Sequence, residues 1–469
     1  HRAGPLAAAA LAALAVGGAA AAPARSESLA DVLAEVYREN PTIRAARAQL
    51  RQTNEEVPQA LAGWRPTVTV TSSVSGRTVD TEDRFRRDGD SAPADARLQL
   101  EQPIYRGGRT FAEVDRAERR VEAGRAELQA TTQEVFARTV RAYADVLRDR
   151  RILELSGRNV EILRDLVEAT DRRLAEGFAT MTDAAEAESR LAGGVARRED
   201  ARGRLEASRA RFEELVGRVP RRLDALPSPP GVPESARAAV AAARADNPAV
   251  RQARLRAKAA TAGVDVARGA LLPSLSLRAS AGKSDDFDRR DVATDDATVR
   301  LQLEVPLYQA GEVYSRTRAA KQAASRRRIQ VAEAVRLARQ QAKSAWADYT
   351  AALQRIDGLK RQVAQAETAL EGAREEFEGG NRTIRDVLDA ETERINAAVR
   401  LARARRDRDV AVFELLRAAG RLTVGRLDLP VAEIRPDADY DAVRDAWIGV
   451  DAPGTATGED PVRADGAGE

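Results

Sequence analysis

Apolar and polar residues alternate with a period of two in four short stretches of the chain, which come in two pairs. The apolar positions are Val68, Val70 and Val74, then Leu98 and Leu100, then Leu275 and Leu277, and last Val299, Leu301, Leu303 and Val305. The residues between them are Thr, Ser, Gln, Arg and Glu. Because side chains of a strand point alternately to opposite faces, each stretch predicts a strand with one apolar and one polar face. A membrane barrel with a water-filled lumen and a half-buried soluble sheet both have this pattern.

Long polar segments separate the two strands of each pair, and helical tracts flank the pairs. The polar segments are 77–94 and 284–296, and helical periodicity covers 29–62, 109–175, 182–217, 236–270, 312–378 and 383–419. A continuous helix over 109–175 has 67 residues and is about 100 Å long at the rise of an α-helix. A rod of that length must cover its narrow Ala/Leu stripe with partner helices, which predicts packed coiled coils.

The whole plan occurs twice. The segment "ENPTIRAARAQL" at 39–50 matches "DNPAVRQARLRA" at 246–257 with an offset of 207 residues, since 246 − 39 = 207. The later matches have an offset of 203, namely "RLQLEQPIYRGG" (97–108) with "RLQLEVPLYQAG" (300–311) and "EGFATMTD" (176–183) with "GGNRTIRD" (379–386), since 300 − 97 = 203. The order is kept throughout, so the chain is a duplication.

The predicted organisation follows from the two copies. Residues 1–24 read as a signal peptide, 25–217 as the first repeat, 218–235 as a Pro-rich linker, 236–420 as the second repeat, 421–450 as a C-terminal segment and 451–469 as a disordered tail. Each repeat holds a helix, a β-hairpin (about 66–104 and 273–306) and a long helical hairpin (109–217 and 312–419). The signal assignment depends on the small, apolar run 5–22, with cleavage after Ala22 or Ala24, the alternative being a membrane anchor helix.

Composition narrows the chemistry. Only 4% of residues are aromatic and 32% are charged, as expected for long helices packed side by side. Lys and Arg number 76 against 73 Asp and Glu, and these charges are interspersed, which disfavours nucleic-acid binding. The chain has no Cys and its only His is His1, so Cys nucleophiles, thiolate or imidazole metal sites and Ser-His-Asp triads are excluded. We expect no enzyme activity, no metal and no cofactor.

One turn stands out by its charge. In "GGNRTIRDVLDAE" (379–391), Ile384, Val387 and Leu388 share one apolar stripe of a helix, while Arg382, Asp386 and Asp389 lie on the other side. The structural interpretation is a helix cap by Thr383 and Asp386, with an ordinary i,i+4 pair between Arg382 and Asp386. The duplicated turn at 176–183 keeps the cap as Thr180 and Asp183 but carries fewer charges.

Four strands cannot close a membrane barrel, since small barrels need about eight. Open strand edges do not lie in lipid, because their backbone N–H and C=O groups would be unpaired. A membrane interpretation therefore requires an oligomer that pools strands, and three copies of four strands give twelve. The barrel argument alone does not fix the number three.

Taken together, these features resemble the TolC family of trimeric outer-membrane export channels over about residues 28–450. The matching pieces are "SLADVLAEVYRENPTI" (28–43), the two "RLQLE" strands, the two turns, and a C-terminal segment, "AAGRLTVGRLDLPVAEIRPDADYDAVRDAWIG" (418–449), most similar to type I secretion members. The resemblance implies an α+β membrane protein: a homotrimer with one 12-stranded β-barrel in the outer-membrane lipid, continuous with a periplasmic barrel of coiled coils. It also implies an equatorial belt formed by 218–240 and the C-terminal segment 421–450. Implied partners are a periplasmic adaptor and an inner-membrane ABC transporter or proton-driven pump.

The resemblance also implies where transport is controlled. Asp386 and Asp389 match the acidic ring at the narrowest point of the pore, and Asp183, Arg382 and Phe377 match the polar links that hold the tip closed. Related channels can use a Tyr hydroxyl where this chain has Phe377, so one link is absent or replaced. The adaptor-binding tips match the first turn at Gly177 and Phe178 and the second at Gly379, Gly380 and Asn381. Six carboxylates around one mouth should attract cations and raise the pKa of some aspartates.

Other functions stay open at this point. Within the channel interpretation, protein secretion and multidrug or metal efflux use the same conduit. A soluble periplasmic coiled-coil scaffold explains the helices but not the charged residues repeated in all four predicted strands. Glycine pairs at 107–108 and 193–194 lack the strand, loop and Lys-Ser/Thr of a phosphate loop, so an enzyme is disfavoured.

Overall fold

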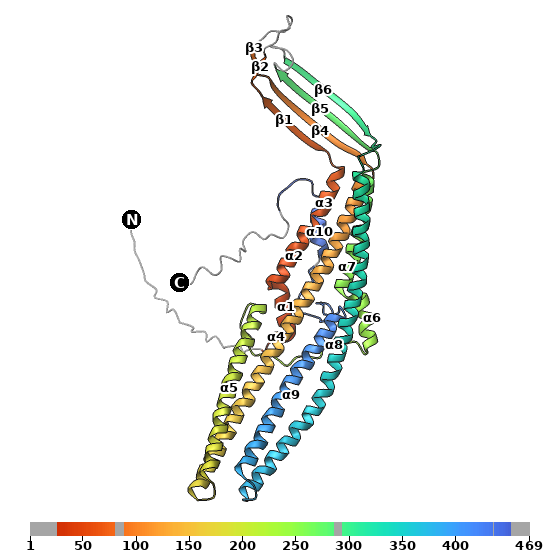
Figure 1. The fold of residues 1–469 in the computed structure, drawn as a ribbon. Helices are drawn as coiled ribbons and strands as arrows, with labels where there is room; N and C mark the ends of the chain where they lie inside the picture. The colour runs from red at the N-terminus through yellow and green to blue at the C-terminus, as the bar shows by residue number, and fades with distance from the viewer. Residues whose placement is uncertain (1–25, 80–88, 286–292, 435, 452–469) are drawn as a thin grey trace, which may run out of the picture.

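A computed structural model describes residues 26–79, 89–285, 293–434 and 436–451. The molecule is an elongated, curved wall of helices with a four-stranded sheet at one end and two helical hairpin tips at the other (Figure 1). The segments predicted as signal peptide (1–24) and, beyond Asp451, as disordered tail lie outside the described residues. No helix among the described residues is both long and apolar enough to cross a membrane.

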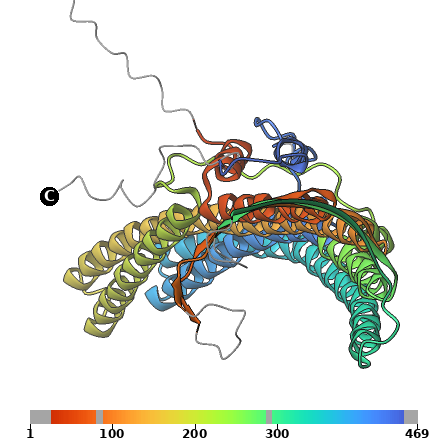
Figure 2. The same ribbon diagram turned by 90° about the horizontal axis from the view of Figure 1, so that it is seen from above.

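Two long helical hairpins make most of the wall. The first pairs α4 (Arg109–Ala175) with α5 (Met181–Val216), and the second pairs α8 (Glu312–Glu378) with α9 (Ile384–Ala418). These bounds agree with the helical periodicity of the sequence to within one residue. Helix α4 also packs against α9, so the hairpins lie side by side. Seen from above, the wall is an arc with α1 and α10 on its convex side (Figure 2).

Shorter helices brace the middle of the wall. They are α1 (Leu29–Glu39), α2 (Pro41–Asn54), α3 (Glu56–Leu61), α6 (Ala236–Asp246), α7 (Pro248–Gly269) and α10 (Pro436–Arg444), with a 3₁₀ turn, η1, at Ala62–Trp64. The largest apolar cluster lies here, around Phe136, Tyr143, Phe212 and Phe413. The Tyr143 hydroxyl lies 2.8 Å from the carbonyl oxygens of both Glu27 and Asp224 and shares its one proton between them, which fastens the linker and the chain before α1 to α4.

The sequence predicts single helices over 29–62 and 236–270, and this is wrong in detail, because each is broken at an Asn-Pro pair. The side-chain oxygens of Asn40 and Asn247 each accept from a backbone N–H two residues ahead, at 3.0 Å, so each Asn caps the helix that its Pro begins. Each buried Asn also donates its amide to a carbonyl near the end of a hairpin helix, to Leu215 at 2.8 Å and to Ala418 at 3.2 Å. The duplicated Asn-Pro motif therefore joins each repeat's brace to its hairpin.

The main sheet has the order β1-β4-β5-β6, and all its pairs are antiparallel. The strands are β1 (Thr67–Val74), β4 (Ala94–Arg106), β5 (Ser274–Asp285) and β6 (Ala293–Glu304), and β2 (Arg77–Val79) with β3 (Gly89–Ser91) forms a separate ribbon. Strands β4 and β5 come from different repeats, so their pairing joins the two copies.

Two strand boundaries differ from the sequence prediction. Strand β4 does not stop at Pro103 but continues through a register shift to Arg106. Pro103 has no backbone N–H to donate, and this is tolerated because the pairing of β4 with β1 ends at Glu101. Strands β5 and β6 extend into the predicted polar loop 284–296, where Lys283 faces Asp295 across the ladder at 3.8 Å. The backbone ladder between the two strands thus extends through this polar sequence, and the opposite charges of Lys283 and Asp295 are compatible with it.

The registers put the alternating residues of all four strands on common faces. One row runs Val70, Leu98, Ala281 and Ala297, and Val68 is paired with Leu100 beside it. The opposite face carries cross-strand ion pairs, Arg97 with Asp296 at 3.2 Å and Arg278 with Glu101 at 3.3 Å. The apolar face is solvent-exposed in the chain. A sheet with one exposed apolar face and one charged face fits lipid outside and water inside.

Candidate functional site at the hairpin tips

Both hairpins end in the same kind of turn, built on a glycine with positive φ. At the first turn the N–H of Phe178 donates to the carbonyl of Arg173 at 2.7 Å, and at the second the N–H of Asn381 donates to Glu376 at 2.8 Å. These are the hydrogen bonds of a Schellman motif, which supply donors to carbonyl groups in the last turn of a helix. Gly177 (φ 81°) and Gly380 (φ 80°) occupy the left-handed position that glycine favours, whereas Gly379 is right-handed.

Each following helix starts with a capping box, as the sequence predicts. Thr180 and Asp183 cap α5, and Thr383 and Asp386 cap α9; each threonine hydroxyl donates to the carboxylate at 2.7 Å. Hydrogen bonds from Thr383 lower the pKa of Asp386, and those from Thr180 lower the pKa of Asp183. Within the chain this is opposite to the rise expected from carboxylate repulsion, because the cap stabilises the charged form of each carboxylate.

Ion pairs join the two hairpins just above the turns. Arg190 on α5 donates to Asp389 on α9 at 2.7 Å, and Arg385 on α9 donates to Glu186 on α5 at 2.9 Å. Arg190 also lies 3.8 Å from Glu186, so the four groups form one chain of alternating charge. We call these residues the tip network. It covers an apolar cluster that includes Leu163, Leu370, Ile384, Val387 and Leu388.

A second tie between the hairpins uses Phe377. The guanidinium of Arg173 lies over the Phe377 ring with its Cζ 4.4 Å from the ring centre, and its Nη1 donates to the Phe377 carbonyl at 2.8 Å. Arg173 is in the last turn of α4 and Phe377 in the last turn of α8. The chain therefore joins its two hairpins at Phe377 without a side-chain hydroxyl, by a cation–π contact and a backbone hydrogen bond.

The other predicted link is not made within the chain. Arg382 pairs with Glu376 across its own turn, and not with Asp183, whose carboxylate is held by Thr180. The sequence-based i,i+4 pair of Arg382 with Asp386 is also replaced by the Glu376 contact, because Asp386 is turned toward the cap. Contact between Arg382 and Asp183 of different copies stays a prediction.

The outermost residues of the first turn are apolar and exposed. Phe178 is 75% exposed and Met181 is 73% exposed. At the second turn, 203 residues later, Asn381 stands in place of Phe178 and the charged Arg382 in place of Ala179, while Ile384, the counterpart of Met181, is buried. The two tips thus offer different chemistry on the same backbone shape.

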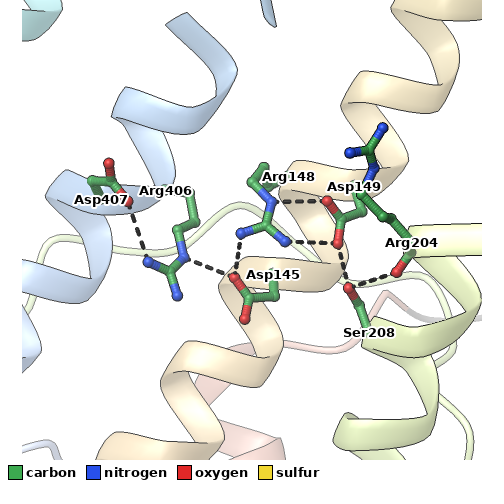
Figure 3. A network of polar contacts seen from close by, with 7 residues as sticks. All are labelled: Asp145, Arg148, Asp149, Arg204, Ser208, Arg406 and Asp407. Atoms are coloured by element: carbon green, nitrogen blue, oxygen red, sulfur yellow. Dashed lines mark hydrogen bonds and ion pairs between the residues drawn. The ribbon is translucent and has the colours of Figure 1, made fainter. Parts of the chain in front are cut away.

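Farther from the tips, a buried polar network joins three helices (Figure 3). On α4, Arg148 donates to both oxygens of Asp149 at 2.8 Å and to Asp145 at 2.7 Å. Asp145 also accepts from Arg406 on α9 at 2.8 Å, and Ser208 on α5 donates to Asp149. The side chain of Asp149 is only 3% exposed. This cluster fixes both hairpins to each other where they leave the braced region.

Sequence reasoning missed the residues that join the hairpins. Arg173, Glu186, Arg190 and Arg385 look like ordinary surface charges of a helix, because their partners are far away in sequence. Asp145 did carry a signal, since "AYAD" (142–145) recurs as "AWAD" (345–348). Among the described residues no group of His, Cys, Asp or Glu could hold a metal ion.

Comparison with known proteins gives consistent matches. The family described as outer membrane efflux protein matches residues 32–218 and 239–421, one block in each repeat. The chain is 32% identical to the outer membrane efflux protein BepC of Brucella suis, over 92% of this chain and 93% of that protein. It is 25% identical to the outer membrane protein TolC of Vibrio cholerae, over 85% and 92% of the two chains.

Two further matches bear on use and fold. The chain is 28% identical to the alkaline protease secretion protein AprF of Pseudomonas aeruginosa over 60% of each protein. The CmeC outer membrane channel of Campylobacter jejuni has the same fold, with a TM-score of 0.76 at 15% identity over 89% of both chains.

Proposed function

Because the chain belongs to the outer membrane efflux protein family, we propose that three copies assemble into an exit duct whose periplasmic end closes around Asp386 and Asp389. The protein is an outer-membrane channel component of tripartite export, not an enzyme. TolC-family channels are trimers that work with periplasmic adaptors and inner-membrane pumps. Because the protein is located in the outer membrane, the alternative interpretation as a soluble periplasmic scaffold is dropped.

The observation that carries the proposal is the two-faced sheet at one end of two paired helical hairpins. Three copies would close twelve strands, with the exposed Val and Leu rows in lipid and the Arg97–Asp296 and Arg278–Glu101 pairs toward water. Closure would also pair the free edges of β1 and β6, which cannot stay open in lipid.

The gate proposal uses charge and geometry at the tip. Asp386 and Asp389 are exposed on α9, beyond its buried stripe. A ring of six such carboxylates would favour cations and let multivalent cations block the mouth. Opening would require the hairpins to separate, which breaks the tip network and the Arg173–Phe377 contact. Asp183 and Arg382 remain candidates for a further link between neighbouring copies.

For the adaptor, the proposed contact is the pair of turns. The first, Gly177-Phe178, offers an exposed aromatic ring, and the second, Gly379-Gly380-Asn381, offers polar backbone and an amide. An adaptor that binds both turns of a hairpin pair touches each side of the tip network, so its binding energy can bias the hairpins toward separation.

Type I protein secretion is the proposed use of the duct. It is supported by the similarity to a protein named for alkaline protease secretion and by the C-terminal segment 418–449. Efflux of small compounds is the second candidate, favoured by the similarity to a protein named as an efflux protein. The two uses imply an ABC transporter and a proton-driven pump, respectively, as the inner-membrane partner.

Deleting the gene in its own host tests the use, and bilayer recording tests the channel. We expect the deletion to remove one or more large proteins from the culture medium and the purified trimer to give cation-selective steps in planar bilayers. Unchanged medium together with increased sensitivity to small toxic compounds would replace secretion by efflux. Purified protein that forms no pore would overturn the channel assignment itself.

A further inference from the structure

After α10 the chain first runs toward the sheet end of the helical wall (Figure 1). Helix α10 is fastened along the way: Arg125 on α4 lies 2.7 Å from Asp437, and Arg444 lies 3.9 Å from Glu118, nearer the start of α4. The direction from Glu118 toward the start of α4 is the direction toward the sheet. Residues 446–450 therefore lie near the level at which the helices meet the strands.

Arg65 holds this segment in place. Its Nη1 donates to the carbonyl of Ala446 at 2.6 Å, and its Cζ lies 4.8 Å from the centre of the Trp447 ring. Arg65 follows η1 directly and is two residues before Thr67, where β1 begins. Trp447 is thus fixed at the foot of a proposed membrane strand.

The residues so placed are apolar and uncovered. Trp447 is 66% exposed, Ile448 98% and Val450 100%. Close by, Trp64 packs edge-on against Phe111, with ring centres 4.8 Å apart, and Phe111 is also exposed. The exposed valines of β1 begin at Val68, four residues after Trp64, so these aromatic side chains lie next to the start of β1.

Two occupants could cover such a surface, a lipid headgroup layer or a second copy of the chain. Helix α10, which leads into the segment, is on the convex side of the helical arc (Figure 2). Copies of an arc that close into a ring meet at their lateral edges, whereas the convex side faces outward. An outward-facing apolar segment at the foot of lipid-facing strands meets the membrane interface, where Trp is enriched because its ring is apolar and its N–H is polar.

We propose that Trp447, Ile448 and Val450 form a membrane-interface anchor that inserts into the phospholipid headgroup region of the inner leaflet, on the periplasmic side of the outer membrane. Arg65 orients the Trp447 ring and leaves guanidinium donors for a lipid phosphate, in the way that long basic side chains reach polar headgroups from an apolar surface. The proposal depends on the outer-membrane location and the fold, and is independent of what the duct exports.

The chain makes a fluorescence test simple, because it has three tryptophans, Trp64, Trp346 and Trp447. A variant with Trp64→Phe and Trp346→Phe reports on Trp447 alone. Reconstituted in phosphatidylcholine vesicles, it should have blue-shifted emission and lose about half of its intensity when the acyl chains are brominated near the headgroup, as for an interfacial ring. The matched control keeps only Trp346, which packs against Tyr349 on α8, and should not respond to brominated lipid.

A second probe covers the case in which the two tryptophan substitutions impair assembly. The chain has no Cys, so Ile448→Cys in the otherwise unchanged protein carries a single nitroxide label. We expect the label to collide more with oxygen, which enriches in lipid, than with a water-soluble nickel chelate. Preference for the chelate, or Trp447 quenching by iodide and not by brominated lipid, would place the segment in water. Shielding from both kinds of reagent would mean that a second copy covers it. Either result overturns the anchor, while the pore steps in planar bilayers report separately on the channel.

Discussion

Arg190 on α5 places a guanidinium nitrogen 2.7 Å from a carboxylate oxygen of Asp389 on α9, across the seam between the two helical hairpins. Asp389 is thus both a proposed pore carboxylate and a member of an ion pair that joins the two hairpins. While the hairpins are together, Arg190 compensates the charge of Asp389. When they separate, Asp389 is unpaired, so opening of the tip would make the mouth more negative.

Removing the cation of this pair should strengthen cation block. Arg190→Gln leaves Asp389 without its partner, and an exposed ion pair contributes up to about 1 kcal/mol, so the blocking concentration of a trivalent cation should fall roughly two- to fivefold. The measurement is block of single trimers in planar bilayers. Arg202→Gln on the same helix is the control, since within the described part of the chain Arg202 is paired with Glu199 of its own helix and not with the other hairpin. Equal block in the two variants would contradict the role of Arg190.

Neutralising Asp386 and Asp389 should weaken the block by multivalent cations. Asp386→Asn with Asp389→Asn keeps the shape of both side chains and removes their negative charges, so we expect multivalent block to weaken at least about tenfold. Asp171→Asn is the control, because Asp171 is an exposed carboxylate of the first hairpin, near the end of α4, and has no proposed role in closing the tip. It should leave block unchanged. If the control variant alone lost the block, the blocking carboxylates would lie on the first hairpin and the assignment to Asp386 and Asp389 would be wrong.

The Arg173–Phe377 contact should help to keep the tip closed. Arg173→Gln removes the cation–π contact and the charge of the hydrogen bond, worth together on the order of 1–3 kcal/mol per copy. We therefore expect a higher resting conductance, with the open probability raised on the order of tenfold or more. Arg172→Gln, one residue earlier and exposed, should behave like the unchanged protein. Identical resting conductance in both variants would mean that the Arg173–Phe377 contact does not stabilise the closed state of the tip.

The capping hydrogen bonds set the pH range over which the tip keeps its charge. Thr383 lowers the pKa of Asp386 below its ordinary value, about 3.9 in unfolded chains. Because the folded pKa is depressed, the cap's contribution to stability is fully present above the unfolded pKa and is lost as pH falls through the folded pKa. Both the α9 cap and the charge at Asp386 should therefore be constant from neutral pH down to about pH 4.

A pH titration of multivalent block measures this directly. With Asp389→Asn as background, the remaining block reports on Asp386, and its midpoint should lie below the ordinary Asp range. Replacing Thr383 by Ala removes the hydroxyl donor and should move the midpoint upward. A midpoint above the ordinary range in the background variant would show that repulsion between the copies outweighs the cap.

The duplication and the two periodicities make the arrangement of strands and long helices predictable, because both are local patterns that the packing preserves. Helix α4 was predicted to within a residue, since its ends are marked by Gly108 and by the Gly177 turn. The Asn-Pro breaks were missed although an Asn before a Pro is itself a helix-start signal. The bond from Asn40 to Leu215 could not be predicted, because the two residues are 175 positions apart.

At the tip, capping was predictable because Thr383 and Asp386 are three residues apart, whereas the ion pairs between hairpins were not. Arg190 and Asp389 are 199 residues apart, and which of many surface arginines faces which acid depends on how α5 and α9 rotate against each other. The family pattern pointed to Arg382 and Asp183 instead. In the chain these two are held locally, by Glu376 and Thr180.

The buried network around Asp149 should be a major determinant of hairpin rigidity. Asp149→Ala removes the bidentate partner of Arg148 and the acceptor for Ser208 at a site that is almost fully buried. Breaking a buried ion pair typically costs about 3–5 kcal/mol. Arg148 keeps its 2.7 Å contact with Asp145, so we expect a loss near the lower end, about 3 kcal/mol.

Heat-induced dissociation of the purified trimer, followed by gel mobility and helix content, measures this loss. Asp171→Ala is the control, because Asp171 is on the same helix but exposed. Asp149→Asn should lie between the two, since an amide oxygen can still accept from Ser208 while the charge opposite Arg148 is gone. If Asp149→Ala dissociated at the same temperature as Asp171→Ala, the network would be a consequence of helix packing and not one of its causes.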